Sequence, residues 1–127
     1  MTKYKSQGFN KTFSNARKGF RLVLKSETNI RIHCIIALLV LFFAYKLNFS
    51  AIEICIVLLA IAIVIISEML NTAIEFALDA VFHNKYSRLV GMAKDISAGA
   101  VMFSSVIAIV IGVLLFGSAL LKFFSLL

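Results

Sequence analysis

The sequence predicts an all-α integral membrane protein in which an amphipathic surface helix precedes three transmembrane helices. The composition, three long apolar segments and a basic N-terminal segment together predict this fold class. Hydrophobic residues make up 61% of the 127 residues, charged residues 15%, and the mean hydropathy is +1.00. Soluble domains are usually about 45–50% apolar and about 25% charged. The composition therefore excludes a soluble domain, a disordered chain and a disulfide-stapled secreted scaffold. No linker-like stretch divides residues 1–127, so we expect a single domain.

The N-terminal region, residues 1–30, has the period of an amphipathic helix. At 100° per residue, six apolar side chains fall within an arc of about 100°, and five basic side chains fall on the other side. The apolar arc contains Phe9, Phe13, Ala16, Phe20, Val23 and Leu24, and the basic arc contains Lys11, Arg17, Lys18, Arg21 and Lys25. Such a helix lies in the membrane interface. If it continues unbroken, Glu27 falls within the apolar arc with Arg31 beside it, an unusual place for an acid.

Three apolar segments predict transmembrane helices at residues 31–48, 50–82 and 93–121. A membrane-spanning helix needs roughly 20 mostly apolar residues. The first segment is short and is interrupted by His33 and Lys46. The second is unbroken from Ile54 to Ile66 but polar in its last third, and the third carries no charge between Ile96 and Leu121.

The basic residues predict the orientation. Eight precede the first apolar run, which begins at Ile32, and three (Lys85, Arg88 and Lys94) lie around the link between the second and third spans. Lys46 and Lys122 lie on the other side. By the positive-inside rule, the N-terminus and the second link are cytoplasmic, in a multi-pass protein of the cytoplasmic membrane. The basic N-terminal segment abuts a span, so anionic headgroups explain its charge more simply than nucleic acid does, at about 1 kcal/mol per basic residue.

Four polar residues form a stripe on the second span. Glu68, Asn71, Glu75 and Asp79 fall within about 80° of helix surface and extend over roughly 16 Å. The stripe could face cytoplasmic water or join helices to one another. For Asp79, the last of the four, the solvent interpretation is as good as the functional one. Glu68 comes just after 13 consecutive apolar residues, where an unpaired carboxylate is costly, so we interpret Glu68 and Glu75 as functional.

The chemistry of these residues suits phosphoryl transfer. Magnesium favours one or two carboxylates together with substrate phosphates, and transfer also needs a cation and a group at the attacking hydroxyl. Glu27 and Glu75 supply metal-type ligands, Lys94 a cation, and Glu68 a base near the membrane surface. A proton-coupled transporter would also use buried acids. No glycine-rich phosphate-binding loop occurs, so a nucleotide site must be of another kind.

Two segments stand out as motifs: residues 68–79, EMLNTAIEFALD, and residues 93–101, AKDISAGAV. They resemble the first and second signatures of the prokaryotic diacylglycerol kinase family, which includes undecaprenol kinases. Lys18-Gly19-Phe20-Arg21 and residues 26–31, SETNIR, resemble parts of the family's surface helix. The resemblance covers about residues 9–121 in the family's order.

The resemblance implies a homotrimer of three-span subunits that phosphorylates a membrane lipid alcohol from Mg-ATP. It implies that Glu68 is the catalytic base and that Glu27 and Glu75 bind the metal and, with it, ATP. The remaining implied positions are Asn71, Lys94 and Asp95 as active-site polar residues, Lys85, Tyr86 and Ser87 (with Lys94 and Asp95) as nucleotide contacts, and Asn29, Arg31 and His33 beside the lipid headgroup. A histidine at a span boundary, such as His33, is more often an interfacial anchor than a catalyst.

We therefore interpret the chain as a Mg-ATP-dependent lipid kinase. Residues 29–33, Asn-Ile-Arg-Ile-His, and the absence of Trp look more like the undecaprenol kinase branch than the diacylglycerol-specific one. A diacylglycerol kinase that makes phosphatidate is the alternative. A non-enzymatic, proton-coupled transporter subunit is a more distant one.

Overall fold

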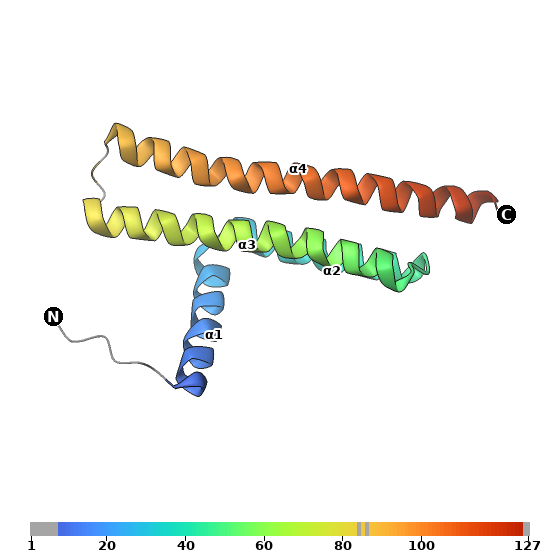
Figure 1. Ribbon diagram of the computed structural model, residues 1–127, viewed down its shortest axis with the longest axis horizontal. Coiled ribbons are helices and arrows are strands. Elements are labelled where there is room, and N and C mark those ends of the chain that lie inside the picture. The colour runs from blue at the N-terminus through green and yellow to red at the C-terminus, as the bar shows by residue number, and fades with distance from the viewer. Residues whose placement is uncertain (1–7, 84, 86, 126–127) are drawn as a thin grey trace.

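The computed structural model describes residues 8–83, 85 and 87–125, which form four helices joined by short links. Their bounds are Phe9–Ser26 for α1, Thr28–Lys46 for α2, Ala51–Phe82 for α3 and Arg88–Ser125 for α4. Helix α3 packs against both α4 and α2, and α1 runs crosswise to these three (Figure 1). Helices α2, α3 and α4 are long and apolar enough to cross a membrane. The predicted fold class is thus confirmed.

The three long helices differ in how far they can extend beyond a bilayer. At 1.5 Å per residue, the 19 residues of α2 span about 28 Å, close to the hydrocarbon thickness of about 30 Å. The 32 residues of α3 and the 38 of α4 span about 48 Å and about 57 Å. The joined ends of α3 and α4 extend past α1 (Figure 1). The last turns of α3 and the first turns of α4 therefore rise above the level of the surface helix.

Helices α2 and α4 begin several residues before the corresponding predicted transmembrane spans. Helix α2 starts at Thr28 and α4 at Arg88, whereas the sequence predicts spans from residues 31 and 93. Hydropathy detects apolar length, and it does not detect a polar helical turn that continues outside the apolar layer. Charged residues such as Arg88 and Lys94 are tolerated in those turns because water or partner side chains can form hydrogen bonds with their charged groups.

The chain turns at Glu27 rather than continuing as one helix. Glu27 has an extended backbone (φ −107°, ψ 121°), and its N–H donates to the Val23 carbonyl at 2.9 Å. The turn reconciles two different helices, because α1 is apolar on one face and α2 is apolar nearly all round. The first suits the plane of the interface and the second suits the bilayer interior. Glu27 is consequently a half-buried junction residue.

The apolar face of α1 has little protein packed against it. Val23 is its buried residue, whereas Phe9, Phe13 and Phe20 are exposed on the described chain. An amphipathic helix with this exposed aromatic face is typical of one that rests on lipid.

The opposite end of the molecule is closed by a tight link and a helix cap. Asn48 adopts the left-handed conformation (φ 54°). Ser50 and Glu53 then form a reciprocal cap: the Glu53 N–H donates to Ser50 Oγ at 3.3 Å, and the Ser50 N–H donates to Glu53 Oε2 at 2.8 Å. This cap satisfies N–H groups that the first turn of α3 would otherwise leave unpaired. The carboxylate of Glu53 is therefore explained by structure.

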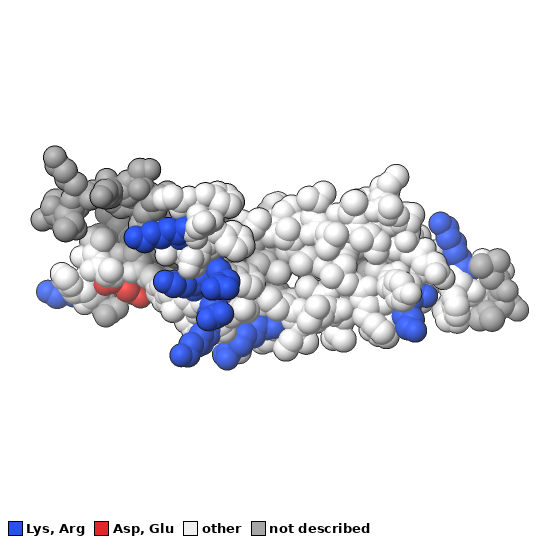
Figure 2. All heavy atoms as spheres, turned by 90° about the horizontal axis from the view of Figure 1, so that it is seen from below, with Lys and Arg blue, Asp and Glu red and all other residues white. Residues whose placement is uncertain are grey.

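The packed core is narrow and lies along α3. It is made of small and β-branched side chains: Val23, Ile30, Ala37, Ala44, Val57, Ala60, Val64 and Val90. Many larger apolar side chains, such as Leu38 and Phe103, point outward. The middle of the face shown in Figure 2 carries no charged side chain, and Lys and Arg gather towards the two ends. Such a surface suits lipid or further subunits.

Candidate active site

Glu68 is buried where α2 meets α3. Only 5% of its surface is exposed, and its Oε1 lies 3.2 Å from Nε2 of His33 on α2. The Thr72 hydroxyl, also buried, donates to the Glu68 carbonyl at 3.0 Å. Among the described residues, no buried side-chain nitrogen or oxygen lacks a partner. The structure thus places a carboxylate inside the helix bundle with an imidazole beside it.

Asn71 connects Glu75 to helix α4. Its Nδ2 donates to Glu75 Oε1 at 3.1 Å, and its Oδ1 accepts a hydrogen bond from the Ser97 hydroxyl at 2.7 Å. The Ser97 hydroxyl also lies 2.9 Å from the Lys94 carbonyl. Because Asn71 uses both ends of its amide, the Glu75 carboxylate is held in a fixed orientation relative to α4.

Asp79 pairs with Lys94 across the same two helices. Lys94 Nζ lies 2.6 Å from Asp79 Oδ1, with side chains 35% and 40% exposed respectively. Asp79 therefore faces partly toward solvent and also holds a cation of the second motif.

The donor set suits a metal ion that arrives with phosphates. In the described part of the chain, no group of three or more His, Cys, Asp or Glu side chains is arranged to hold a metal ion. A closed protein cage would need such a group, whereas Mg²⁺ typically uses one or two carboxylates plus substrate phosphates and water. Glu75, half-buried and oriented by Asn71, and Glu27, at the α1–α2 junction, are carboxylates of the required kind.

The other predicted site residues that the structure describes lie on the first turns of α2, in the α3–α4 link and on the first turns of α4. Asn29 and Arg31 are exposed on the first turns of α2, and an Arg31 guanidinium N–H donates to the Thr28 hydroxyl at 2.9 Å. Lys85 and Asp95 are exposed, and Tyr86 lies outside the described residues. The Ser87 hydroxyl accepts a hydrogen bond from the Val90 N–H at 3.2 Å, so this side chain caps the start of α4.

Ser97 is the site residue that sequence reasoning undervalued. It lies in the run of small residues of the second motif, which suits close helix packing, but its hydroxyl also bonds Asn71 of the neighbouring helix. Its position three residues after Lys94 places the two side chains on one helix face, and this spacing was the available signal.

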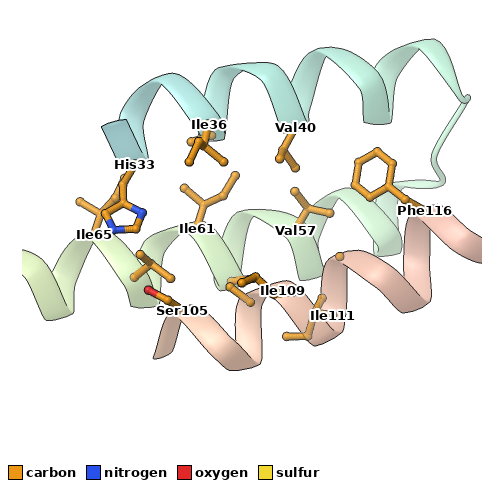
Figure 3. A pocket seen from close by; sticks show the side chains of 15 residues that line it. His33, Ile36, Val40, Val57, Ile61, Ile65, Ser105, Ile109, Ile111 and Phe116 are labelled. Atoms are coloured by element: carbon orange, nitrogen blue, oxygen red, sulfur yellow. The ribbon is translucent and has the colours of Figure 1, made fainter. Parts of the chain in front are cut away.

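An apolar cavity of about 270 Å³ lies between α2, α3 and α4. Figure 3 shows Ile36 and Val40 of α2, Val57 and Ile61 of α3, and Ile109 of α4 around it. His33 lines one end of the cavity, beside Ile65 (Figure 3). The side chain that contacts Glu68 therefore also borders an apolar space inside the bundle.

Comparison with known proteins assigns a family to this arrangement. Residues 14–116 match the family described as prokaryotic diacylglycerol kinase. The chain belongs to the prokaryotic diacylglycerol kinase family. That stretch contains both motifs and every described residue of the site, so the family match and the predicted resemblance rest on the same segment.

Relatives within the family carry two activities in their names. The undecaprenol kinase of Bacillus subtilis (strain 168) is 37% identical over 108 residues, which cover 85% of this chain and 87% of that protein. The diacylglycerol kinase of Synechocystis sp. is 33% identical over 101 residues, covering 80% of this chain but only 58% of the relative. The diacylglycerol kinase of Escherichia coli (strain K12) is 31% identical over 93 residues, covering 73% and 75%. The chain is thus a member of a family of lipid kinases, as its two motifs predicted.

Proposed function

We propose that this family member transfers the γ-phosphate of ATP to the hydroxyl of a membrane lipid alcohol, undecaprenol in preference to diacylglycerol, with Mg²⁺ as cofactor. The observation that carries the proposal is the position of Glu68. Its carboxylate is buried beside His33, and His33 borders the apolar cavity between the helices. A carboxylate that is separated from an apolar space by one side chain suits a substrate with a hydroxyl head and a hydrocarbon tail.

Glu68 has the chemistry of a base for the lipid hydroxyl. As the hydroxyl oxygen bonds to the γ-phosphorus and the bond to ADP breaks, the hydroxyl proton passes to the Glu68 carboxylate. Lys94 is held near the stripe by Asp79 and supplies positive charge for the phosphates. When bound, Mg²⁺ would neutralise phosphate charge, and Glu27 and Glu75 are the carboxylates that would hold it.

The remaining contacts are those that the family resemblance implies. Lys85, Ser87 and Asp95, near the joined ends of α3 and α4, are nucleotide contacts in this proposal, together with Tyr86. Asn29 and Arg31, on the first turns of α2, lie beside the lipid headgroup. The tail lies along the cavity. The preference for undecaprenol is supported by the higher identity to the Bacillus subtilis enzyme than to the diacylglycerol kinases.

We further propose that the protein works as a homotrimer in the cytoplasmic membrane, with its N-terminus in the cytoplasm. One subunit leaves much of its large apolar surface and part of its polar stripe uncovered. Neighbouring subunits would cover that surface and complete the walls of the site.

A direct test presents undecaprenol and diacylglycerol side by side to the purified protein in lipid nanodiscs with labelled ATP. We expect label in the lipid phase, more on undecaprenol, and only in the presence of Mg²⁺. Glu68→Gln should abolish most of the signal, whereas Ser67→Ala, one position earlier on the same helix, should not. Label mainly on diacylglycerol would reverse the substrate preference. No label on either lipid would overturn the proposed reaction.

A further inference from the structure

We propose that His33 is a positioning residue that orients the Glu68 carboxylate towards the lipid hydroxyl. This inference rests on the proposed function and adds to it, because nothing in the phosphoryl-transfer scheme itself requires a histidine. His33 and Glu68 come from different helices and are 35 positions apart in the chain. Their contact at 3.2 Å is a product of the fold.

The burial of the pair gives the contact its importance. The Glu68 side chain is 6% exposed and the His33 side chain 26%. Among the described residues, His33 places a ring nitrogen within hydrogen-bond distance of this carboxylate. A buried carboxylate without a polar partner is strongly disfavoured. Without His33, Glu68 would therefore rotate towards water or towards another partner.

The geometry divides the two carboxylate oxygens between two tasks. Nε2 of His33 faces Oε1, and the proposal assigns Oε2 to the substrate. An imidazole N–H directed at one oxygen limits rotation of the carboxylate, just as an orienting partner fixes a catalytic side chain elsewhere. In the transfer step the lipid O–H bond breaks, its proton goes to Glu68 Oε2, and the lipid oxygen replaces the ADP oxygen on phosphorus. His33 holds Oε1 throughout and gains no new bond.

The apolar cavity gives a second argument for a functional role of His33. His33 contacts Glu68 and also lines the apolar cavity, as Figure 3 shows for its ring. It thus stands between the space for the tail and the base for the head. A mere membrane anchor would not need to contact a buried carboxylate.

The test compares three substitutions of His33 that differ in whether the new side chain can place an N–H donor at the position of Nε2. Gln can place an N–H close to the position of Nε2, Asn is too short to reach it, and Leu has no donor. We expect His33→Leu and His33→Asn to lower kcat by about 10- to 100-fold, the loss usual when an orienting partner is removed. The KM values for lipid and Mg-ATP should stay close to wild type. His33→Gln should retain most of the activity. Cys34→Ala, at the next position of α2, serves as the matched control and should behave as wild type.

Each outcome separates this inference from the proposed function. If the wild-type protein phosphorylates lipid and His33→Leu keeps its kcat, His33 does not position Glu68 and the kinase function stands. A rise in the lipid KM at unchanged kcat would make His33 a headgroup contact instead. Equal losses in the Gln and Asn variants would also overturn the inference, because a donor at the Nε2 position would then be irrelevant. If the wild-type protein itself labels no lipid, the proposed function fails first.

Discussion

Three carboxylates assigned to one reaction lie in three different surroundings. Glu68 is buried against an imidazole, Glu75 is half-buried and accepts a hydrogen bond from Asn71, and Glu27 sits at the turn between two helices. The three carboxylates therefore differ in burial and in hydrogen-bond partners, and these differences suit them to different roles. A buried group next to an apolar cavity suits proton transfer, whereas the two more open groups suit a hydrated cation.

The first prediction separates these roles. Glu75→Gln and Glu27→Gln should weaken Mg-ATP affinity, and raising Mg²⁺ should partly restore activity by mass action. Glu68→Gln should lower kcat by about 10²–10⁴, the usual contribution of general-base assistance, and extra metal should not restore it. The measurement is Mg-ATP binding and turnover of all three variants across a Mg²⁺ series. Rescue of Glu68→Gln together with no rescue of Glu75→Gln would mean that the roles are reversed.

The sequence predicts the residues of the polar stripe, whereas it does not predict which side chains contact them. Helical spacing places Glu68, Asn71, Glu75 and Asp79 on one face because the period of a helix is local information. The pairing of Glu68 with His33 depends on how α2 packs on α3, and no periodicity relates positions on separate helices. For the same reason, the sequence could give Lys94 a charge role but could not show that Asp79 holds it.

At the scale of the elements, α3 and α4 are joined by the Asp79–Lys94 pair and by a Ser97–Asn71 hydrogen bond whose contribution can be isolated experimentally. Ser97 and Ser104 are each 7% exposed on α4, and each hydroxyl donates to a carbonyl three residues earlier. Ser97 alone of the two also lies within hydrogen-bond distance of Asn71 Oδ1 on α3, so that its single proton is shared between the two acceptors. The two serines therefore form a matched pair that differs by one interhelical bond.

The second prediction uses that pair. Ser97→Ala should destabilise the protein by about 0.5–1.5 kcal/mol more than Ser104→Ala, because Asn71 Oδ1 loses its partner within the bundle. It should also reduce activity, because Asn71 then holds Glu75 less firmly. Thermal unfolding in detergent and lipid phosphorylation measure the two effects. Equal behaviour of the two variants would show that the Asn71–Ser97 bond contributes nothing beyond packing.

The third prediction concerns the surface helix α1. Burying a Phe side chain contributes about 1.5–3 kcal/mol, so replacing Phe20 by a charge should shift the docking of α1 on the membrane by roughly 10- to 100-fold. Lys18→Asp, on the opposite arc, should have a much smaller effect. The comparison is activity in bilayers for Phe20→Asp against Lys18→Asp. Similar losses in both variants would contradict an oriented amphipathic helix.

How far the elements follow from the sequence depends on the kind of signal. The amphipathic period of α1 and the apolar length of α2, α3 and α4 are strong, so the number and order of the helices follow from them. The break at Glu27 carries no Gly or Pro, and it arises because two helices with different apolar surfaces need different orientations. The early start of α4 at Arg88 was missed because hydropathy does not register a polar helical turn.

At the scale of the whole molecule, the distribution of charge and the lengths of the helices indicate the same placement of the protein in the membrane. Basic side chains collect at both ends of the face in Figure 2, with an uncharged band between them. The joined ends of α3 and α4 extend past α1 (Figure 1), and they carry Glu75, Asp79 and Lys94. The proposed phosphate chemistry is therefore at a membrane surface, and Glu68 lies between it and the apolar interior.

The fourth prediction is the orientation of this arrangement in the membrane. ATP is cytoplasmic, so the end with the α3–α4 link must face the cytoplasm, in agreement with the larger number of basic residues there. In a variant without Cys34 and Cys55, a single cysteine at Asn48 should react with an impermeant reagent added outside intact cells, and one at Lys85 should react only after lysis. Both positions are exposed and lie in links at opposite ends of the bundle, so burial does not confound the comparison. The reverse labelling pattern would place Glu75 and Lys94 outside the cell, away from ATP, and would overturn the proposed site as a whole.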